Sequence, residues 1–270
     1  GCGEKDSPEL QAKTPEAPKA LVNVPVTPKI PDKKPLTKKE SAKVIEAAVR
    51  KAAKKPTGEL TNADLDKVTR LTLLNNQLTD VKSLEKLTQL KVLNLQHNQL
   101  TELPEELENL TQLTSLSLSY NQLTDVKGLE KLTQLTSMWL DSNKLTNVEG
   151  LEKLTQLKYL DLDDTQLTDV KGLENLTLLT YLNLGRNQLT SVEGLENLTK
   201  LEWLYLYGNK LTDVKGLEKL VKLGELHLDR NQLTDVKGLE KLTWLTRLRL
   251  TNNPDLTKAQ IAELQKALPK

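Results

Sequence analysis

The chain has 270 residues, of which 37% are apolar and 28% are charged, a composition ordinary for a soluble folded protein. No apolar run approaches the roughly 18–20 residues of a membrane-spanning helix, and the single cysteine excludes an intramolecular disulfide framework and a Cys-rich zinc site. The net charge of +1 conceals an asymmetry. Residues 1–56 carry 13 Lys plus Arg against 7 Asp plus Glu, a net +6, so the remainder is net −5.

Residues 1–36 are predicted to be an extended, solvated linker, because they hold most of the prolines, many lysines and no apolar period. Cys2 stands at the head of this segment. The arrangement resembles the start of a mature bacterial lipoprotein, in which a Cys after a small residue is lipidated. That resemblance implies a lipid-anchored protein of the bacterial cell envelope, and Gly3 in place of Asp favours the outer membrane by analogy. The alternatives are an unmodified exposed thiol or a cloning remnant.

Residues 37–67 are predicted to form a helical N-terminal cap. In "LTKKESAKVIEAAVRKAAKK", Thr37 and Glu40 have the spacing of a capping box. One helical face then collects Val44, Ile45, Ala48, Val49 and Ala52. A second helix start is expected at Thr61 and Asp64, just before the first strand.

Residues 68–256 are predicted to be nine repeats of 22–23 residues. Each reads L-x-x-L-x-L-x-x-N-x-L, as in "LTSLSLSYNQL", followed by a linker such as "TDVKGLEK". The middle leucines of a short strand point inward, and stacked coils bury what one coil cannot. The polar residue that recurs at each turn is Asn76, Asn98, Asn121, Asn143, Thr165, Asn187, Asn209, Asn231 or Asn253. An inward Asn implies a ladder of hydrogen bonds to backbone groups.

Residues 257–270 are predicted to be a C-terminal capping helix. Thr257 and Gln260 form another capping-box pair, and Ile261, Leu264 and Leu268 share one helical face. Together with the N-terminal helices, this segment would shield the open ends of the repeat core.

These units resemble internalin-type leucine-rich repeats, in both the 22-residue period and the "LTDVKGLEKLTQL" linkers, and "NADLDKVTRLTL" is similar to the end of that family's N-terminal cap. The resemblance covers about residues 37–270. It implies an α/β solenoid, a right-handed horseshoe with a concave parallel sheet, short helical turns on the convex side, and partner binding on the concave face. An immunoglobulin-like domain and a wall-anchoring signal are missing from the pattern, so a role in host-cell invasion is not inferred.

The third, fifth and seventh positions of each unit alternate with the core leucines and are therefore predicted to face the concave surface. Six of the eight Trp and Tyr residues fall at these positions, all in units four to seven. The predicted ligand-binding residues are Trp139, Asp141, Tyr159, Asp161, Asp163, Tyr181, Trp203, Tyr205, Tyr207, His227 and Arg249. β-Propensity alone could explain the aromatics, but the third unit has Ser115, Ser117 and Ser119 there, and clustered exposed aromatics usually mark recognition.

Evidence for chemistry in the sequence is thin. His97 and His227 lie in distant units and cannot share a metal, and no nucleophile or phosphate-binding loop accompanies His227, which we expect to be a surface residue. Asp161 and Asp163 lack the loop that calcium coordination normally uses. We therefore expect no catalysis, metal or cofactor. Nucleic acid is not expected either, since the basic N-terminal segment has no interleaved aromatics.

Two functions remain open from the sequence. The preferred one is a membrane-anchored, monomeric recognition module that binds a protein or peptide, with glycan as a second type of ligand. The other is a structural scaffold of the cell envelope whose sheet has no defined ligand.

Overall fold

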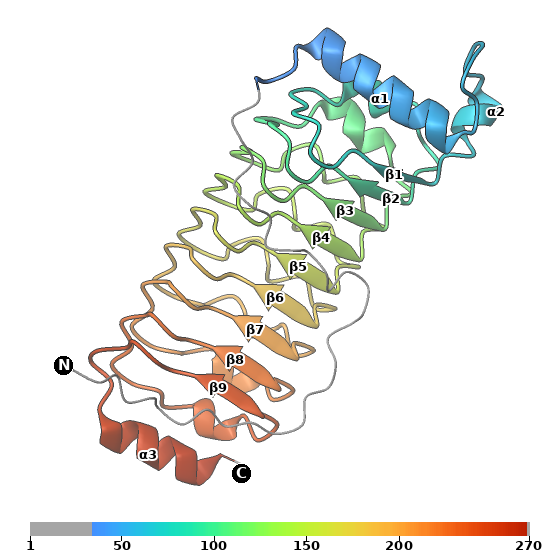
Figure 1. Ribbon diagram of the computed structural model, residues 1–270. Helices are drawn as coiled ribbons and strands as arrows, with labels where there is room; N and C mark the ends of the chain where they lie inside the picture. The colour runs from blue at the N-terminus through green and yellow to red at the C-terminus, as the bar shows by residue number, and fades with distance from the viewer. Residues whose placement is uncertain (1–33, 269–270) are drawn as a thin grey trace.

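A computed structural model describes residues 34–268 of the chain. The described residues form an elongated solenoid of stacked coils (Figure 1). Helix α1 (Lys38–Ala52) and the short helix α2 (Asn62–Leu65) lie at one end, and helix α3 (Lys258–Ala267) lies at the other. The horseshoe architecture predicted from the repeat pattern is confirmed.

One strand from each repeat joins a single parallel sheet of nine strands, in chain order from β1 to β9. The strands are β1 (Arg70–Thr72), β2 (Val92–Asn94), β3 (Ser115–Ser117), β4 (Ser137–Trp139), β5 (Tyr159–Asp161), β6 (Tyr181–Asn183), β7 (Trp203–Tyr205), β8 (Glu225–His227) and β9 (Arg247–Arg249). Each pair is in register, so equivalent repeat positions are direct neighbours, as Tyr159 is of Tyr181.

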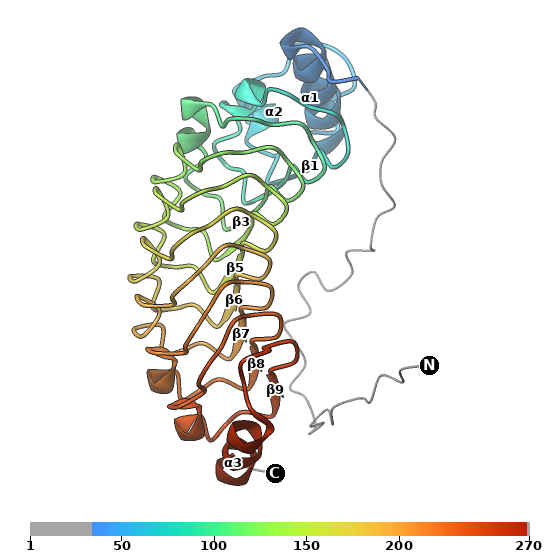
Figure 2. The same cartoon turned by 90° about the vertical axis from the view of Figure 1, so that its left-hand side faces the viewer.

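The sheet lines the inner side of the curve, and short helical turns lie on the outer side (Figure 2). The 3₁₀ turns are η1 (Lys82–Leu84), η2 (Glu105–Asn109), η3 (Leu217–Lys219) and η4 (Leu239–Lys241). The strands and the 3₁₀ turns are both short, since each strand has three residues and each 3₁₀ turn has three to five. Each coil therefore presents one short strand on the inner side of the curve.

The interior is a continuous leucine core. Leu160 and Leu162, the inward residues of β5 and the position after it, are both 0% exposed, and the same holds for their equivalents in most other coils. Full burial of one such side chain contributes about 2 kcal/mol. Because the core runs the whole length of the solenoid, the fold does not depend on the outward residues of the strands.

The asparagine ladder predicted from the sequence is confirmed. Asn143 donates to the carbonyls of Leu118 (3.0 Å) and Leu140 (2.9 Å) and accepts a hydrogen bond from the N–H of Leu123 (3.0 Å). Thr165 takes the ladder position in the fifth coil, where its Oγ1 lies 3.1 Å from the carbonyl oxygen of Leu162 and 2.5 Å from Asn187 Oδ1, the two acceptors available to its one hydroxyl proton.

A second repeated device, which the sequence analysis missed, lies in the convex "GLE" segments. Gly150 and Gly194 have φ of 105° and 106°, which other L-residues rarely adopt. The N–H of Gly150 donates to the carboxylate of Glu152 at 2.8 Å, and that of Gly194 donates to Glu196 at 2.7 Å. The Gly and Glu of each linker therefore form a local turn, with the positive φ supplied by glycine.

Both predicted capping boxes, at Thr37 and Thr257, are present, and the helix start expected at Thr61 also has one. The predicted apolar face of α1 is wrong at one position: Ala52 is exposed, whereas Ala53, just after the helix, is 7% exposed and packs in the core. No helix among residues 34–268 has both the length and the apolar character required to cross a membrane.

Candidate functional site

Strands β4 to β8 place five aromatic rings in one continuous row on the concave face. The ring centroids of Trp139 and Tyr159 lie 5.0 Å apart, and those of Tyr159 and Tyr181 lie 4.1 Å apart in a stacked pair. Tyr181 meets Tyr205 edge-on at 5.4 Å, and Tyr205 meets the ring of His227 edge-on at 4.7 Å. We call these five residues the aromatic row. Such ring pairs stabilise by about 0.5–1.5 kcal/mol beyond the area they bury, so the row is a preformed surface.

Two of the predicted aromatics lie outside this row. Trp203 is half-buried beside Tyr181 in the sheet register, but it forms no ring stack with another aromatic among residues 34–268. Tyr207 instead reaches back two coils, and its hydroxyl donates to Asp163 Oδ1 at 2.8 Å. Tyr207 therefore holds a neighbouring carboxylate in place rather than extending the row.

The path of Tyr207 depends on a glycine in the coil that it crosses. A Cβ on Gly185 would lie 2.5 Å from Tyr207 Cε1 and 2.7 Å from Asp163 Oδ1, closer than atoms approach without displacement. Arg186, the next residue, forms an ion pair with Asp163, and its guanidinium carbon lies 5.8 Å from the centre of the Tyr207 ring. Gly185, Arg186 and Tyr207 thus form one packed unit around Asp163.

Three carboxylates, those of Asp141, Asp161 and Asp163, lie beside the aromatic row at the fifth and seventh positions of units four and five. Ser119 donates to Asp141 Oδ1, and the N–H of Asp163 donates to Asp161 Oδ1 at 3.0 Å. Arg186 is the cation paired with this group in the described part of the chain, through Asp163.

The surroundings disfavour ionisation of these groups. Burial raises the pKa of Asp161 to about 8, and the nearby charge of Asp141 adds to the shift. Burial also raises the pKa of Asp141 and of Asp163. The same cause raises the pKa of Tyr159 to about 12. Near neutral pH Asp161 therefore keeps its proton, and a cation placed beside it would release that proton.

A second polar cluster ends the row at strands β8 and β9. The carboxylate of Glu225 is 2.8 Å from His227 Nε2 and 3.2 Å from Arg247 Nη1. The side chain of His227 is only 13% exposed, so the expectation of a surface histidine is wrong, because the Tyr205 ring and Glu225 cover it. Burial lowers the pKa of His227, and the charge of Glu225 partly opposes that shift. Arg249 is exposed on the last strand.

The structure places all of the predicted concave residues from Trp139 to Arg249 on the strands or just after them, in neighbouring coils. Sequence reasoning missed Arg186 and Gly185, since the eighth position was not considered and a glycine at the seventh gave no sign of its steric role. It also missed the pair of His97 and Tyr120, whose rings stack at 4.3 Å after β2 and β3. Cys2, the predicted lipid-attachment residue, lies outside the described residues.

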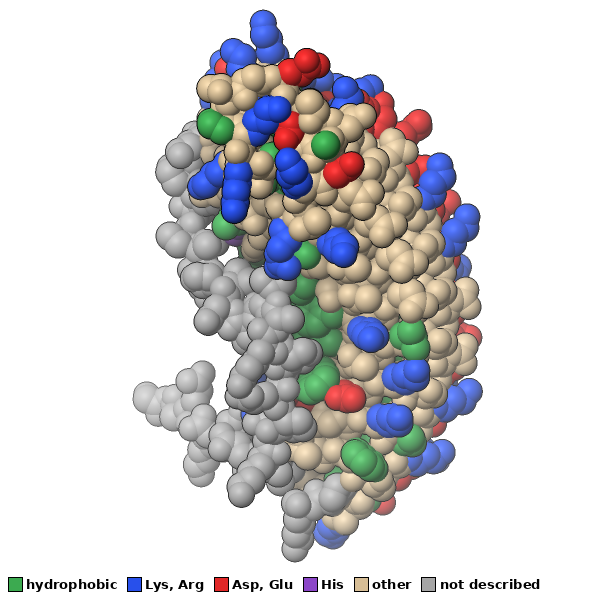
Figure 3. All heavy atoms as spheres, turned by 90° about the vertical axis from the view of Figure 1, so that its right-hand side faces the viewer, with side chains coloured by type: hydrophobic (Ala, Val, Ile, Leu, Met, Phe, Trp, Pro, Cys, Tyr) green, Lys and Arg blue, Asp and Glu red, His purple; other side chains and the backbone are tan. Residues whose placement is uncertain are grey.

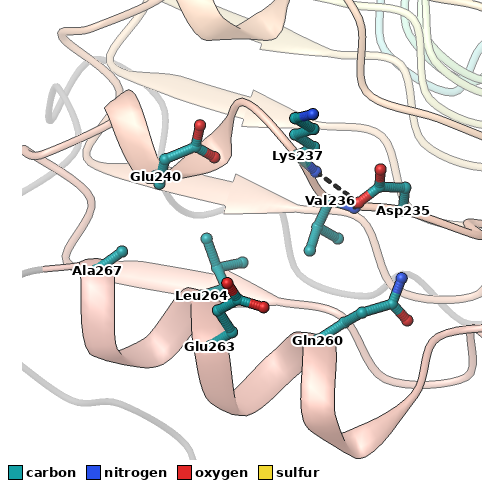
Figure 4. Close-up of a pocket in the computed structure, with 8 residues that line it drawn as sticks. All are labelled: Asp235, Val236, Lys237, Glu240, Gln260, Glu263, Leu264 and Ala267. Atoms are coloured by element: carbon teal, nitrogen blue, oxygen red, sulfur yellow. Dashed lines mark hydrogen bonds between the residues drawn. The ribbon is translucent and has the colours of Figure 1, made fainter.

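A partly open hollow lies elsewhere, at the seam between α3 and the convex turn of the eighth coil, with a volume of about 370 Å³ (Figure 4). Its polar groups are committed to the scaffold: Gln260 donates to the carbonyl of Thr234 at 3.0 Å, and Glu240 accepts from the N–H of Gly238. Among residues 34–268, no three His, Cys, Asp or Glu side chains are grouped so that they could hold a metal ion.

The chain matches two protein-family models. The family model "Leucine Rich repeats (2 copies)" matches residues 111–153, 155–197 and 199–239, and "Leucine rich repeat" matches residues 64–123. No curated protein sequence matches the chain.

Three solved structures share the fold. Internalin C2 of Listeria monocytogenes is 37% identical, with a TM-score of 0.74 over 77% of this chain and 92% of that protein. A leucine-rich repeat protein of Leptospira interrogans is 35% identical (TM-score 0.73, 77% of this chain and 54% of that one). The internalin inlF of Listeria monocytogenes is 27% identical (TM-score 0.69, 77% and 68%). The chain therefore belongs to the leucine-rich repeat family, and its repeats are of the internalin type.

Proposed function

We propose that this protein is a recognition module that binds a protein or peptide on its concave face, with glycan as a second type of ligand. The observation that carries the proposal is the aromatic row, five rings in contact across five adjacent strands. Aromatic side chains dominate the binding energy of protein interfaces because they bury a large area at little entropic cost. Internalin-type relatives of the same architecture support a binding role rather than an enzymatic one.

The dimensions favour an extended segment. Neighbouring strands are about 4.8 Å apart, so five strands span roughly 19 Å, the length of about six residues of extended chain. A segment lying across the strands would meet each ring of the row in turn. A compact globular partner would use the same surface by inserting a loop into the curve.

The partner should carry positive charge beside apolar or planar groups. Asp141, Asp161 and Asp163 flank the row, with Arg186 as their paired cation. In the eighth coil, Asp229 Oδ1 is buried and has no hydrogen-bond partner in the described part of the chain, so a donor group of the partner would satisfy it. A Lys or Arg side chain over the Tyr rings would gain a cation–π contact and neutralise a carboxylate.

Anchoring is part of the same proposal. Lipidation of Cys2 would fix the protein to the bacterial cell envelope, in the outer membrane, with the Pro-rich linker as a spacer. We expect a monomer that binds no nucleic acid and needs no cofactor. The precursor should partition with membranes, and Cys2→Ser should release it; an unchanged membrane fraction in Cys2→Ser would remove the anchor from the proposal.

The binding test uses a displayed library of extended peptides selected against the full chain. The double change Tyr159→Ser and Tyr181→Ser removes the stacked centre of the row while leaving Tyr207 and its packing intact. Losing even one such aromatic typically costs about 2 kcal/mol, roughly thirtyfold in affinity, so the double variant should bind selected peptides at least thirtyfold more weakly. Selected peptides should be enriched in Lys or Arg next to apolar residues.

The matched control is Trp244→Gln, which replaces the most exposed of the large apolar side chains noted in the described chain, at 71% exposure. Several other units have Gln at this position, and it lies before strand β9, away from the row. Binding should be unchanged in the control. If affinity survives the double Tyr change in a folded protein, the scaffold alternative replaces the binding proposal.

A further inference from the structure

The positive charge of the protein is concentrated at one end. Residues 34–56 contain 8 Lys plus Arg against 2 Asp plus Glu, a net +6, although the whole chain is net +1. These residues surround and include α1, the helix that closes the solenoid (Figure 1). Lys and Arg side chains accordingly gather over this end of the molecule (Figure 3). The net charge of the rest of the protein therefore has the opposite sign to that of its N-terminal cap.

The two sides of α1 have different roles. Ile45 and Val49 are buried against the first coil, whereas Lys39, Lys43 and Lys51 are exposed on the other side of the helix, and Lys54 follows just after it. Spacings of four and eight residues put Lys39, Lys43 and Lys51 on one side of α1, and Lys54 continues from the end of the helix with a left-handed φ of 56°. We call these four residues the lysine stripe. None of these four forms an ion pair with another residue of the described chain.

Other cations of the cap are already committed. Lys55 pairs with Asp64 at 2.7 Å, and Lys38 lies 3.6 Å from Asp80. The four-lysine stripe is thus distinct from the charges that hold the cap together. It contributes nothing visible to folding, and mutual repulsion of its charges opposes stability slightly.

A hollow of about 460 Å³ lies at the end of this stripe, lined by Ala47, Arg50, Lys51, Lys54 and Pro56. Arg50 is held there by Glu46 (2.8 Å) and by a hydrogen bond from Nη1 to the carbonyl of Gly58 (2.8 Å). Lys51 and Lys54, which form no ion pair in the described chain, line this depression beside the paired Arg50 and give a place for a phosphate group.

We infer that the exposed face of α1, made of Lys39, Lys43, Lys51, Lys54 and the hollow at Arg50, docks on the anionic headgroups of a lipid bilayer. Each Lys near such a surface contributes roughly a fivefold gain in partitioning at moderate ionic strength. Nucleic acid is disfavoured as the partner because α1 has no aromatic residue on which a base could stack. The choice of a bilayer rests on the proposed anchor at Cys2, since the linker from that residue leads directly into α1.

This contact would orient the molecule. Helix α1 lies at one end of the solenoid, so docking through its outer face keeps the contact away from strands β4 to β8, which carry the aromatic row (Figure 1). The basic cap would then hold the N-terminal end of the solenoid at the membrane, and the acidic repeats would extend away from the membrane.

The test uses the full chain carrying Cys2→Ser, so that no lipid anchor contributes, and measures co-sedimentation with vesicles. Vesicles of phosphatidylcholine mixed with phosphatidylglycerol should retain the protein, and vesicles of phosphatidylcholine alone should not. High salt should release it. Changing the four lysines of the stripe to Gln should weaken retention at least tenfold. Changing them to Arg should leave retention unchanged.

The control removes the same charge elsewhere, from exposed lysines of the repeats: Lys127, Lys153, Lys171 and Lys237, each to Gln. This control should bind vesicles within about twofold of the parent. Equal losses in the two quadruple variants would mean that net charge alone is responsible, and tighter binding to duplex DNA than to vesicles would point to a different polyanion. Either result overturns the inference. The Cys2→Ser fractionation experiment is run at high salt, which screens the lysine contact, so release there reports on the lipid anchor alone, whereas vesicle retention of the Cys2→Ser chain at low salt reports on the lysines alone.

Discussion

The third and seventh coils share one backbone but differ completely on the concave face. Strand β3 carries Ser115 and Ser117 outward, and strand β7 carries Trp203 and Tyr205 at the same two positions. Both strands are three residues long, both pair in register with their neighbours, and in both the inward leucine is 0% exposed. The comparison shows that coil formation places no demand on these outward residues, so their aromatic content in units four to seven reflects another requirement.

The two coils differ in a second way. Ser119, at the seventh position of the third coil, donates only to Asp141 in the next coil, whereas Tyr207 at the equivalent position reaches two coils back to Asp163. Tyr207 therefore links two coils that are not neighbours, whereas Ser119 links adjacent coils.

The asparagine ladder should contribute equally to stability in the third and seventh coils. Asn121 of the third coil and Asn209 of the seventh make equivalent bonds to two carbonyls and one N–H. Each change to Ala should lower the free energy of unfolding by about 2 kcal/mol, because buried backbone groups lose their partners. Urea denaturation of the two variants measures this, and costs that differ by more than about 1 kcal/mol would show that the concave face contributes to coil stability.

The packed unit around Gly185 should make stability depend on the outward residues of the seventh coil, unlike those of the third. Gly185→Ala forces its Cβ against the Tyr207 ring and should lower the free energy of unfolding by about 1–2 kcal/mol. In a Tyr207→Ser background, the same change should cost less, since the ring is gone and the Asp163 carboxylate, 2.7 Å from the added Cβ, is no longer held by the Tyr207 hydroxyl. Denaturation of the single and double variants gives the coupling energy. Additive costs would mean that Tyr207 does not lie over Gly185 in solution.

The buried carboxylate should make stability depend on pH. The pKa of Asp161 is raised to about 8 in the folded protein, and in an unfolded chain an Asp titrates near 4. Between these values the native state binds the extra proton, so the contribution of Asp161 to stability is full at low pH and is lost as the pH rises through about 8. Asp161→Asn should flatten this dependence in thermal melts recorded from pH 5 to about 9. A variant with the slope of the parent would place the titrating group elsewhere.

The protonation of Asp161 should also make the affinity for a cationic peptide depend on pH. A cationic peptide that pairs with Asp161 should bind more tightly as the pH rises towards about 8, because the carboxylate forms without the cost of removing its proton. Titration calorimetry in two buffers of different ionisation enthalpy would count the proton released on binding. Asp161→Asn should bind without proton release.

The smallest effect is expected where the serine coil is converted towards the aromatic one. Ser117→Tyr places a ring beside Trp139, its direct neighbour in the register, and should change the free energy of unfolding by less than about 0.5 kcal/mol. A melting temperature close to that of the parent would sharpen the contrast between the two coils. A large loss would show that serine is required at this position for folding.

Much of the architecture was determined by the sequence alone. Leucines at the inward positions, with Met138 as the exception in β4, and an Asn at every turn but that of Thr165 define a period of 22 residues. Such a period has one solution, because only stacking of similar coils buries those apolar residues and satisfies those amides. The capping boxes at Thr37, Thr61 and Thr257 are equally local, since each depends on two side chains three residues apart. The concave positions from Trp139 to Arg249 follow from the same alternation.

What only the tertiary structure decided is which of those outward residues touch. Tyr207 and Asp163 are 44 residues apart, and their contact depends on the missing side chain of Gly185 in the coil between them. The raised pKa of Asp161 likewise comes from burial and from Asp141 in the preceding coil. Periodicity assigns each side chain to a face, but rotamers, steric gaps and local dielectric depend on three or more coils at once. Those quantities are set by packing across the sheet, and no pattern along the chain encodes them.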